Sequence, residues 1–129
     1  PEEPVTQTKK TKGDKTFRQR LEETNDQFKN LYSSIRDYIL SLGDDIAENQ
    51  LKLYVAFKKV KNIACIEVYQ SYILMHLRVN PDTVTLEAGK YEDVRDKGHW
   101  GTGDLRVIIK NNTDFENAKP LLNRAYYEN

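Results

Sequence analysis

Residues 53–79 read LYVAFKKVKNIACIEVYQSYILMHLRV, and the two-residue period of this stretch decides the fold class. Apolar side chains alternate with polar or aromatic ones in three runs, separated by the lysine-rich turn at 58–62 and by residues 69–71. Such alternation over about four to eight residues is typical of a strand with one buried face. The stretch therefore predicts three antiparallel strands joined by short turns.

Helical periodicity flanks these strands on both sides. Before them, apolar residues recur at helical spacing over residues 28–42. After them, residues 104–110 alternate as a fourth strand, and residues 115–126 have the spacing of a last helix. We therefore predict an α+β fold with an N-terminal helix, a four-stranded antiparallel sheet and a C-terminal helix, the helices lying on one sheet face.

The 129 residues are expected to form one domain, because 38% are hydrophobic and 31% are charged, as in ordinary globular proteins. Residues 1–15 are polar apart from prolines, one glycine and Val5, so they cannot bury enough surface to offset the entropy of ordering. We interpret residues 1–15 as a flexible linker or an expression remnant, and residues 16–129 as a single α+β domain.

Composition excludes several classes of function. Twenty basic and twenty acidic residues give no net charge, so the broad basic field of a dedicated nucleic-acid binder is missing. The single cysteine, Cys65, excludes an internal disulfide, and with two histidines it gives no zinc-ligand spacing, so we predict no metal and no cofactor. No apolar run approaches the ~18 residues of a membrane span, and the first residues lack a signal-peptide core. A cytoplasmic protein without a membrane partner is therefore expected.

Residues 98–104, GHWGTGD, concentrate the only tryptophan, one of two histidines and half of the six glycines. They end a connection that is too long for a simple turn, and such loops are often functional. The glycines lack the following helix of a dinucleotide-binding loop, so a glycine-permitted turn is the simpler interpretation. The candidate binding residues here are Arg95, His99, Trp100, Gly101, Gly103 and Asp104.

This loop is predicted to be a rigid recognition element without catalytic residues. His99 with a carboxylate such as Asp104 could serve acid–base chemistry, but no serine or cysteine nucleophile is adjacent in the sequence. We expect Trp100 to pack on the sheet, and Asp104 to accept hydrogen bonds from loop amides or from Arg95.

The sheet face opposite the helices is a second candidate surface. Strand parity places Tyr54, Tyr72 and His76 on it, so these residues are expected to be exposed, or covered only by a second copy. Such an aromatic face can stack bases, dock on another domain or form a homodimer.

Three lysines, Lys58, Lys59 and Lys61, cluster at the tip of the first hairpin. They could contact phosphates of double-stranded DNA as a wing. The alternative is a hairpin end whose charges only keep the protein in solution.

Several motifs in their observed order resemble a known family. They are LGDD at 42–45, KLYVAFKK at 52–59, Arg95, GHWGTGD at 98–104 and AYYE at 125–128. Over residues 26–129 the chain is similar to an uncharacterised bacterial and archaeal domain often labelled a predicted transport protein. Thr102 stands where asparagine is frequent in that family, and Val60 where glycine is. The transport label has no support in this sequence, which lacks a membrane segment.

The resemblance implies a C-terminal module of larger proteins, joined to nuclease-like or type IV restriction-like regions that attack foreign DNA. The chain lacks a nuclease site of its own, since Tyr69 stands where the lysine of such a site would follow Glu67. We therefore expect a non-catalytic accessory domain, not an enzyme, that assists DNA engagement by a larger restriction or antiviral defence nuclease.

Three alternatives stay open. The domain could dock on its parent protein or dimerise. It could hold a small molecule or modified base in a pocket lined by His99, Trp100 and Tyr54. It could also be an enzyme that uses His99 and Asp104.

Overall fold

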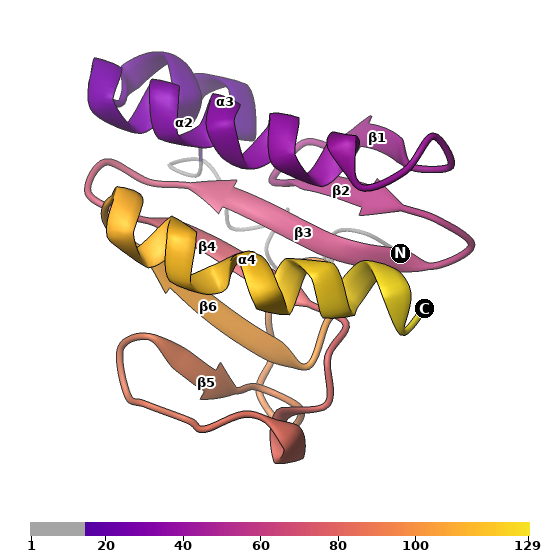
Figure 1. Ribbon diagram of the computed structural model, residues 1–129. Helices are drawn as coiled ribbons and strands as arrows, with labels where there is room; N and C mark the ends of the chain where they lie inside the picture. Colours follow the sequence, from indigo (N-terminus) through magenta and orange to yellow (C-terminus); the bar gives the residue numbers. More distant parts are fainter. Residues whose placement is uncertain (1–14) are drawn as a thin grey trace.

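The computed structural model describes residues 15–129, so the predicted linker lies outside the described residues except for Lys15. Three α-helices and six strands follow one another along this part of the chain (Figure 1). In order they are α2 (Phe17–Glu23), α3 (Asp26–Ser41), β1 (Ala47–Gln50), β2 (Val55–Lys58), β3 (Asn62–Val68), β4 (Ile73–Leu77), the 3-10 turn η1 (Pro81–Thr83), β5 (Tyr91–Asp93), β6 (Leu105–Ile109) and α4 (Asn112–Tyr127).

Each α-helix begins at a polar cap. Thr16 and Gln19 form a capping box at the start of α2. The Asn25 side chain accepts a hydrogen bond from the Phe28 amide at the start of α3, and Asn111 does the same for Asp114 at the start of α4. These caps satisfy amides that the first turn leaves without a partner, so they fix where each helix begins.

The strands form one antiparallel sheet in the order β1-β2-β3-β4-β6-β5. The prediction of four strands is therefore wrong, because β1 and β5 add an edge strand on each side. β1 reads AENQ and is exposed along its whole length, so it shows no hydrophobic alternation. β5 has only three residues, YED, and pairs with β6 within the long connection.

The residues between β1 and β2 also differ from the prediction. Residues 51–54 form a turn instead of the start of a strand, closed by a hydrogen bond from the Leu51 amide to the Tyr54 carbonyl oxygen. The following strand is consequently shorter than the alternating pattern indicates.

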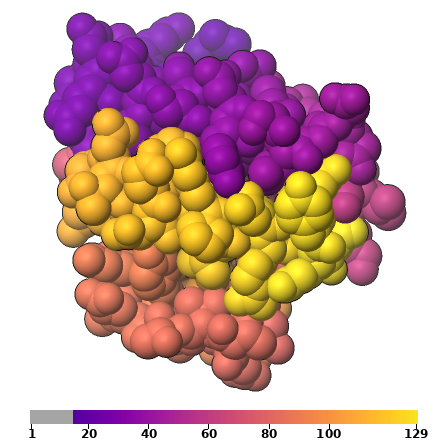
Figure 2. Space-filling view, viewed as in Figure 1, coloured from indigo at the N-terminus to yellow at the C-terminus, as the bar shows by residue number. Residues whose placement is uncertain are grey.

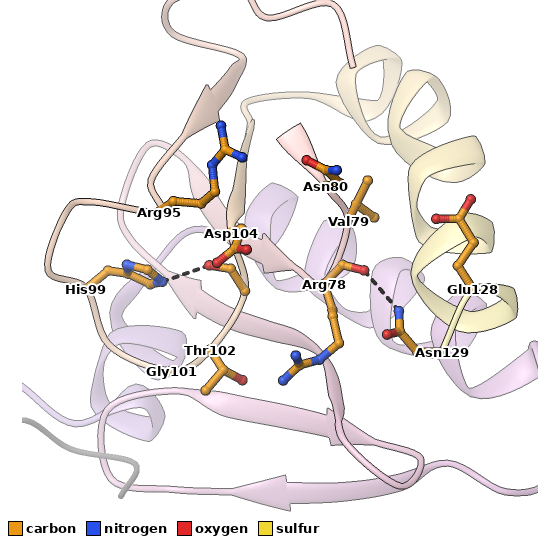
Figure 3. Close-up of a pocket in the computed structure, with 11 residues that line it drawn as sticks. Arg78, Val79, Asn80, Arg95, His99, Gly101, Thr102, Asp104, Glu128 and Asn129 are labelled. Atoms are coloured by element: carbon orange, nitrogen blue, oxygen red, sulfur yellow. Dashed lines mark hydrogen bonds between the residues drawn. The ribbon is translucent and has the colours of Figure 1, made fainter. Parts of the chain in front are cut away.

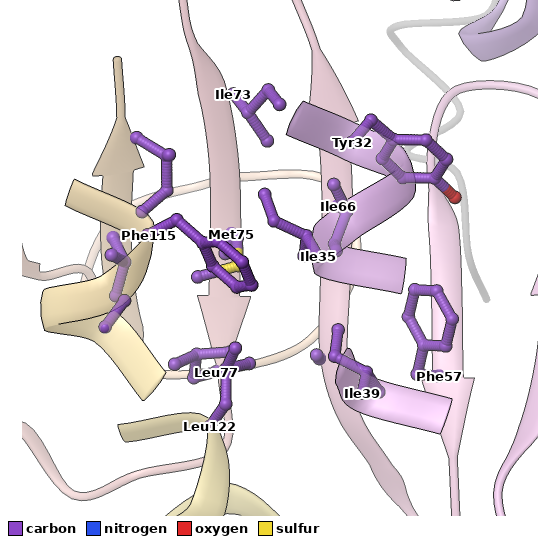
Figure 4. Packing of buried hydrophobic residues seen from close by; sticks show 14 of the residues in the cluster. Tyr32, Ile35, Ile39, Phe57, Ile66, Ile73, Met75, Leu77, Phe115 and Leu122 are labelled. Carbon is purple, nitrogen blue, oxygen red and sulfur yellow. The ribbon is translucent and has the colours of Figure 1, made fainter. Parts of the chain in front are cut away.

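Helices α3 and α4 lie side by side over one face of the sheet, and in the space-filling view their atoms cover it except near β5, which stays visible below α4 (Figure 2). We call this the helix-covered face. The main core fills the space between, with Ile35 and Ile39 of α3 and Leu122 of α4 packed toward Ile66 and Met75 of the sheet (Figure 4). Helix α2 lies where β3 ends, and Thr24 at its C-cap donates a hydrogen bond to the Tyr69 carbonyl oxygen at 3.3 Å.

The opposite face is covered by residues 94–104, which we call the cover loop. A second buried cluster lies beneath it, formed by Leu53, Tyr54, Ala56 and Cys65 with Trp100 packed against them. The expected exposure of Tyr54 and His76 is therefore wrong, since their side chains are 1% and 0% exposed. Strand parity placed them on the correct face, but a loop of the same chain buries it.

Candidate functional site

The cover loop lies directly on the sheet because two of its glycines have conformations that other residues rarely adopt. Gly101 has φ +76° and Gly103 has φ +135°. A Cβ at Gly101 would lie 2.8 Å from Cβ of Cys65, and one at Gly103 would lie 2.8 Å from the His76 backbone. These glycines therefore permit a backbone-to-strand approach that a side chain would block.

Hydrogen bonds hold the two ends and the middle of the cover loop. The Val94 amide donates to the Asp104 carbonyl oxygen at 2.9 Å, which closes the loop at its base. The Thr102 amide lies 3.4 Å from the Cys65 sulfur. The predicted packing of Trp100 on the sheet is confirmed, although its ring is only half-buried. The cover loop is thus held against the sheet as an ordered part of the domain.

His99 is fixed from three sides. Its Nδ1 lies 2.9 Å from the Lys97 carbonyl oxygen, and its Nε2 lies 2.9 Å from that of Gly103. Its ring also stacks on the ring of His76, with 4.4 Å between centroids and 28° between planes. His99 therefore supports the loop from inside, and one of its two ring faces is already occupied.

Beneath His99, His76 is the centre of a buried polar row. Its Nε2 accepts a hydrogen bond from Nε of Arg106 at 3.1 Å, which assigns the ring proton to Nδ1. Burial, followed by the neighbouring His99 and Arg106, lowers the pKa of His76 to about 3. His76 is therefore neutral around pH 7.

The row continues from His76 to Glu67 on β3. Nδ1 of His76 lies 3.8 Å from Oε2 of Glu67 and has no hydrogen-bond partner among the described residues. Burial raises the pKa of Glu67, and the Tyr69 hydroxyl donates a hydrogen bond to its other oxygen. Tyr72 is half-buried and stacks on Tyr69, with centroids 4.9 Å apart. His76 and Glu67 are buried and do not reach solvent, whereas Tyr69 and Tyr72 are partly exposed at the end of the row.

An open polar cleft of about 710 Å³ lies beside the cover loop, between the end of β4 and the C-terminal residues after α4 (Figure 3). Eleven residues line it, namely Arg78, Val79, Asn80, Arg95, His99, Gly101, Thr102, Gly103, Asp104, Glu128 and Asn129. Five of the predicted loop residues thus come together, while Trp100, Tyr54 and Tyr72 do not line the cleft. Arg78 is the main residue that the sequence-based candidate set missed.

Arg95 does not bind Asp104, so that expected contact is wrong. Its NH2 group lies 2.7 Å from a carboxylate oxygen of Asp93 and 2.8 Å from one of Asp82. These hydrogen bonds raise the pKa of Arg95 and lower the pKa of both aspartates. Arg95 is therefore neutralised by two acids at the rim of the cleft.

Arg78 and Asp104 carry the free charges of the cleft. Nε of Arg78 donates to the Asn62 carbonyl oxygen at 2.8 Å, and its terminal nitrogens have no hydrogen-bond partner within residues 15–129. The exposed Asp104 carboxylate has none in that range either. The two side chains do not form an ion pair with each other, so both can bind a ligand.

The lysines of the β2–β3 hairpin divide into two kinds. Nζ of Lys59 donates to the Tyr126 carbonyl oxygen at 3.0 Å and lies 4.2 Å from the Tyr126 ring centroid. Lys58 and Lys61 are exposed. In the β2–β3 register Lys58 lies opposite Asn62, and the Asn62 carbonyl oxygen accepts a hydrogen bond from Arg78. Lys58, Lys61 and Arg78 therefore lie at the same end of the sheet. We call Lys58, Lys61 and Arg78 the basic end.

Two motifs far apart in the sequence meet near Lys59. The Tyr126 hydroxyl donates to a carboxylate oxygen of Asp45 at 2.6 Å. A Cβ at Gly43 would lie 2.0 Å from that hydroxyl oxygen, so a larger residue there would displace the Tyr126 hydroxyl from this position. The LGDD and AYYE motifs therefore join the end of α3 to the end of α4.

Candidate catalytic or metal-binding groups are sparse in the described residues. Cys65 is buried, and burial raises the pKa of its thiol, so it is a poor nucleophile. No group of three or more His, Cys, Asp or Glu side chains in residues 15–129 has an arrangement that could hold a metal ion. In the same part of the chain, each helix is too short or too polar to cross a membrane.

Comparisons with known proteins relate this chain to an uncharacterised family. Residues 14–129 match the family described as a domain of unknown function (DUF5655). An uncharacterized protein of Haemophilus influenzae is 31% identical over 105 residues, which cover 81% of this chain and 35% of that protein. This chain thus spans about a third of the length of that relative, and no solved structure matches it. The expected membership of an uncharacterised domain family is confirmed, and the chain belongs to the DUF5655 family.

Proposed function

We propose that this domain is a non-catalytic accessory module that helps a larger restriction or defence nuclease engage DNA. The observation that carries the proposal is the basic end, where the exposed Lys58 and Lys61 lie at the same end of the sheet as Arg78, which lines the open cleft. Phosphate contacts from such cations supply most of the sequence-independent affinity for DNA. A chain with no net charge requires a local patch of this kind.

The accessory role has two supports. The relative from Haemophilus influenzae is about three times as long as the matched region, which fits a module within a larger protein. Cys65, Glu67 and His76 are buried, and both ring nitrogens of His99 lie 2.9 Å from main-chain carbonyl oxygens, so few groups are available for nucleophilic or acid–base chemistry. The catalytic work is therefore assigned to other parts of the parent protein, and DNA engagement to this domain.

The test is a double variant of the hairpin, Lys58→Ala with Lys61→Ala, measured with the 129-residue chain and duplex DNA. Log affinity falls as log salt rises, and each lost phosphate contact makes this negative slope shallower by about 0.9. We expect the slope to become shallower by about 1.8 for the pair, and affinity to weaken similarly for different sequences. Unchanged affinity and slope would reject the basic end as the DNA contact.

The control is Lys90→Ala with Lys110→Ala, which removes the same charge elsewhere. Lys110 follows Ile109, which pairs with Ile73 at the start of β4, whereas Arg78 follows the other end of β4. The Lys90 carbonyl oxygen binds the Ile108 amide, so Lys90 lies near the same far end. If the control weakens binding as much as the test variant, binding follows overall charge and not the basic end.

A second candidate function is a pocket for a small molecule or a modified base. The cleft favours it because about 710 Å³ falls within the usual range of small-ligand sites. Its lining differs from the expected one, since Tyr54 is buried beneath the cover loop and only His99 of the three named residues reaches the cleft. Docking or dimerisation through the second sheet face loses its basis for the same reason.

A further inference from the structure

The cleft holds one cation and one carboxylate that are both left without a partner in the described chain. The terminal nitrogens of Arg78 are donors only, and the two oxygens of Asp104 are acceptors only. The Asp104 main chain is fixed, because its carbonyl oxygen accepts the Val94 amide at 2.9 Å. A ligand that binds both groups needs an anionic group for Arg78. It also needs hydrogen-bond donors, at a separate position, for the Asp104 carboxylate.

We propose that the cleft binds an unpaired guanine nucleotide, with its base edge on Asp104 and its phosphate on Arg78. This inference takes its DNA setting from the proposed function, and it names the ligand of the same cleft. Asp104 and Arg78 both line the cleft, and Figure 3 shows the Arg78 side chain extending toward Thr102, apart from Asp104, with His99 on the cover loop.

Hydrogen-bond complementarity selects guanine among the four DNA bases. Guanine alone presents two adjacent donors, N1–H and N2–H, on its Watson–Crick edge. A carboxylate can accept both at once, one on each oxygen of Asp104. Adenine, cytosine and thymine each place an acceptor next to their donor, and that acceptor would face a carboxylate oxygen. The free carboxylate therefore attracts guanine and disfavours the others.

Arg78 and His99 complete the fit. A guanidinium fork matches the oxygens of a phosphate, and Nε of Arg78 is held by Asn62 so that its terminal nitrogens stay available. His99 lines the cleft with one ring face already against His76, so a base that stacks on it must use the other face. Stacking on such a ring is sequence-tolerant, so base selection falls to Asp104.

The ligand test titrates the chain with dGMP, dIMP, dAMP and deoxyguanosine by NMR. Inosine lacks only the N2 amino group, so dIMP removes a single donor to the carboxylate. We expect dGMP to bind about tenfold more tightly than dIMP, and dAMP to bind more weakly than both. Deoxyguanosine, which lacks the phosphate, should also bind more weakly than dGMP.

Variants assign these preferences to residues. In Asp104→Ala the preference for dGMP over dIMP and dAMP should disappear, whereas Asp96→Ala, an exposed carboxylate of the same loop outside the cleft lining, should retain it. In Arg78→Ala dGMP should bind no better than deoxyguanosine, and Arg78→Lys should restore part of the difference. Equal binding of the three nucleotides to the native chain, or a guanine preference that survives Asp104→Ala, would overturn the inference.

Thymidine oligonucleotides with and without one central guanine separate this inference from the proposed function. If the guanine-containing strand binds more tightly than free dGMP, the cleft recognises guanine within DNA. This result supports both the guanine site and the proposed function. Binding of DNA with no guanine preference overturns the guanine site and leaves the accessory function standing. A preference for free dGMP without oligonucleotide binding supports the site and rejects the DNA role, and no binding of either ligand overturns both.

Discussion

The two faces of the sheet are buried by different means. On the helix-covered face, α3 and α4 meet the strands through aliphatic and aromatic side chains such as Ile35, Ile66 and Leu122. On the other face, the cover loop lies on a row that includes Cys65 and His76, with histidine stacking and hydrogen bonds between them.

This difference separates stability from recognition. Apolar packing on the helix-covered face depends only on the shape and volume of the side chains. It therefore contributes to the free energy of folding but presents no polar groups to a ligand. The cover loop buries one set of polar groups and presents another, Asp104 and His99, to the cleft beside Arg78. We call the sheet face under the cover loop the loop-covered face. It presents the groups that can bind a ligand, so a change there should affect binding more than folding.

The largest effect on stability is expected from Ile39→Ala on the helix-covered face. Ile39 is fully buried between α3 and the sheet, and such truncations cost about 2–5 kcal/mol through lost transfer energy and the residual cavity. Urea unfolding measures the loss, and dGMP binding to the folded variant should stay unchanged. A loss of binding without a loss of stability would contradict the division between the faces.

A smaller effect is expected from Trp100→Ala on the loop-covered face. Because the Trp100 ring is half-buried, its removal should cost about 1–3 kcal/mol, less than for a fully buried tryptophan. The cover loop should loosen, so dGMP affinity should fall although the helices remain. The same unfolding and titration experiments check this, and an effect as large as that of Ile39→Ala would show that the loop-covered face carries the main core.

The most specific effect on stability is the pH dependence that His76 confers. Its pKa is lowered from 6.5 to about 3, so the unfolded chain binds a proton in this window while the folded chain does not. The free energy of unfolding therefore falls as the pH falls from 6.5 to about 3, by at most about 1.4 kcal/mol per pH unit from this group.

Glu67 acts in the opposite direction, because its raised pKa makes the folded state less stable as the pH rises and the carboxyl ionises. In His76→Gln, which keeps an acceptor for Arg106, the acid-induced loss of stability should be shallower than in the native chain. Unfolding at several pH values measures this. An identical slope in the variant would mean that His76 is not buried in its neutral form.

The elements with a regular hydrophobic period could be predicted from the sequence. Features that depend on contacts between distant parts of the chain could not. Strands β2, β3, β4 and β6 and the two long helices repeat apolar residues at regular spacing, so their existence could be predicted. The exposed residues of β1, one alanine followed by three polar residues, carry no such signal. Tyr54 and His76 were assigned to the correct face, but local pattern cannot show that a distant loop returns to cover it.

The same limit applies to the candidate site. The composition of residues 98–104 identified the loop, since glycine, histidine and tryptophan are scarce elsewhere in the chain. The pairing of Arg95 with Asp82 and Asp93, which leaves Asp104 free, depends on the position of η1 beside β5. That Arg78 and Asp104 line the same cleft depends on which strand ends lie together, and no local pattern encodes that.

Labelling of Cys65 with a thiol reagent tests the central claim most directly, because it is the single cysteine and lies under the cover loop. The native chain should react far more slowly than the urea-unfolded chain, and Trp100→Ala should accelerate labelling under conditions in which the helices stay folded. Reaction of native Cys65 at the rate of an exposed thiol would contradict the account, because it would show that the second face of the sheet is open.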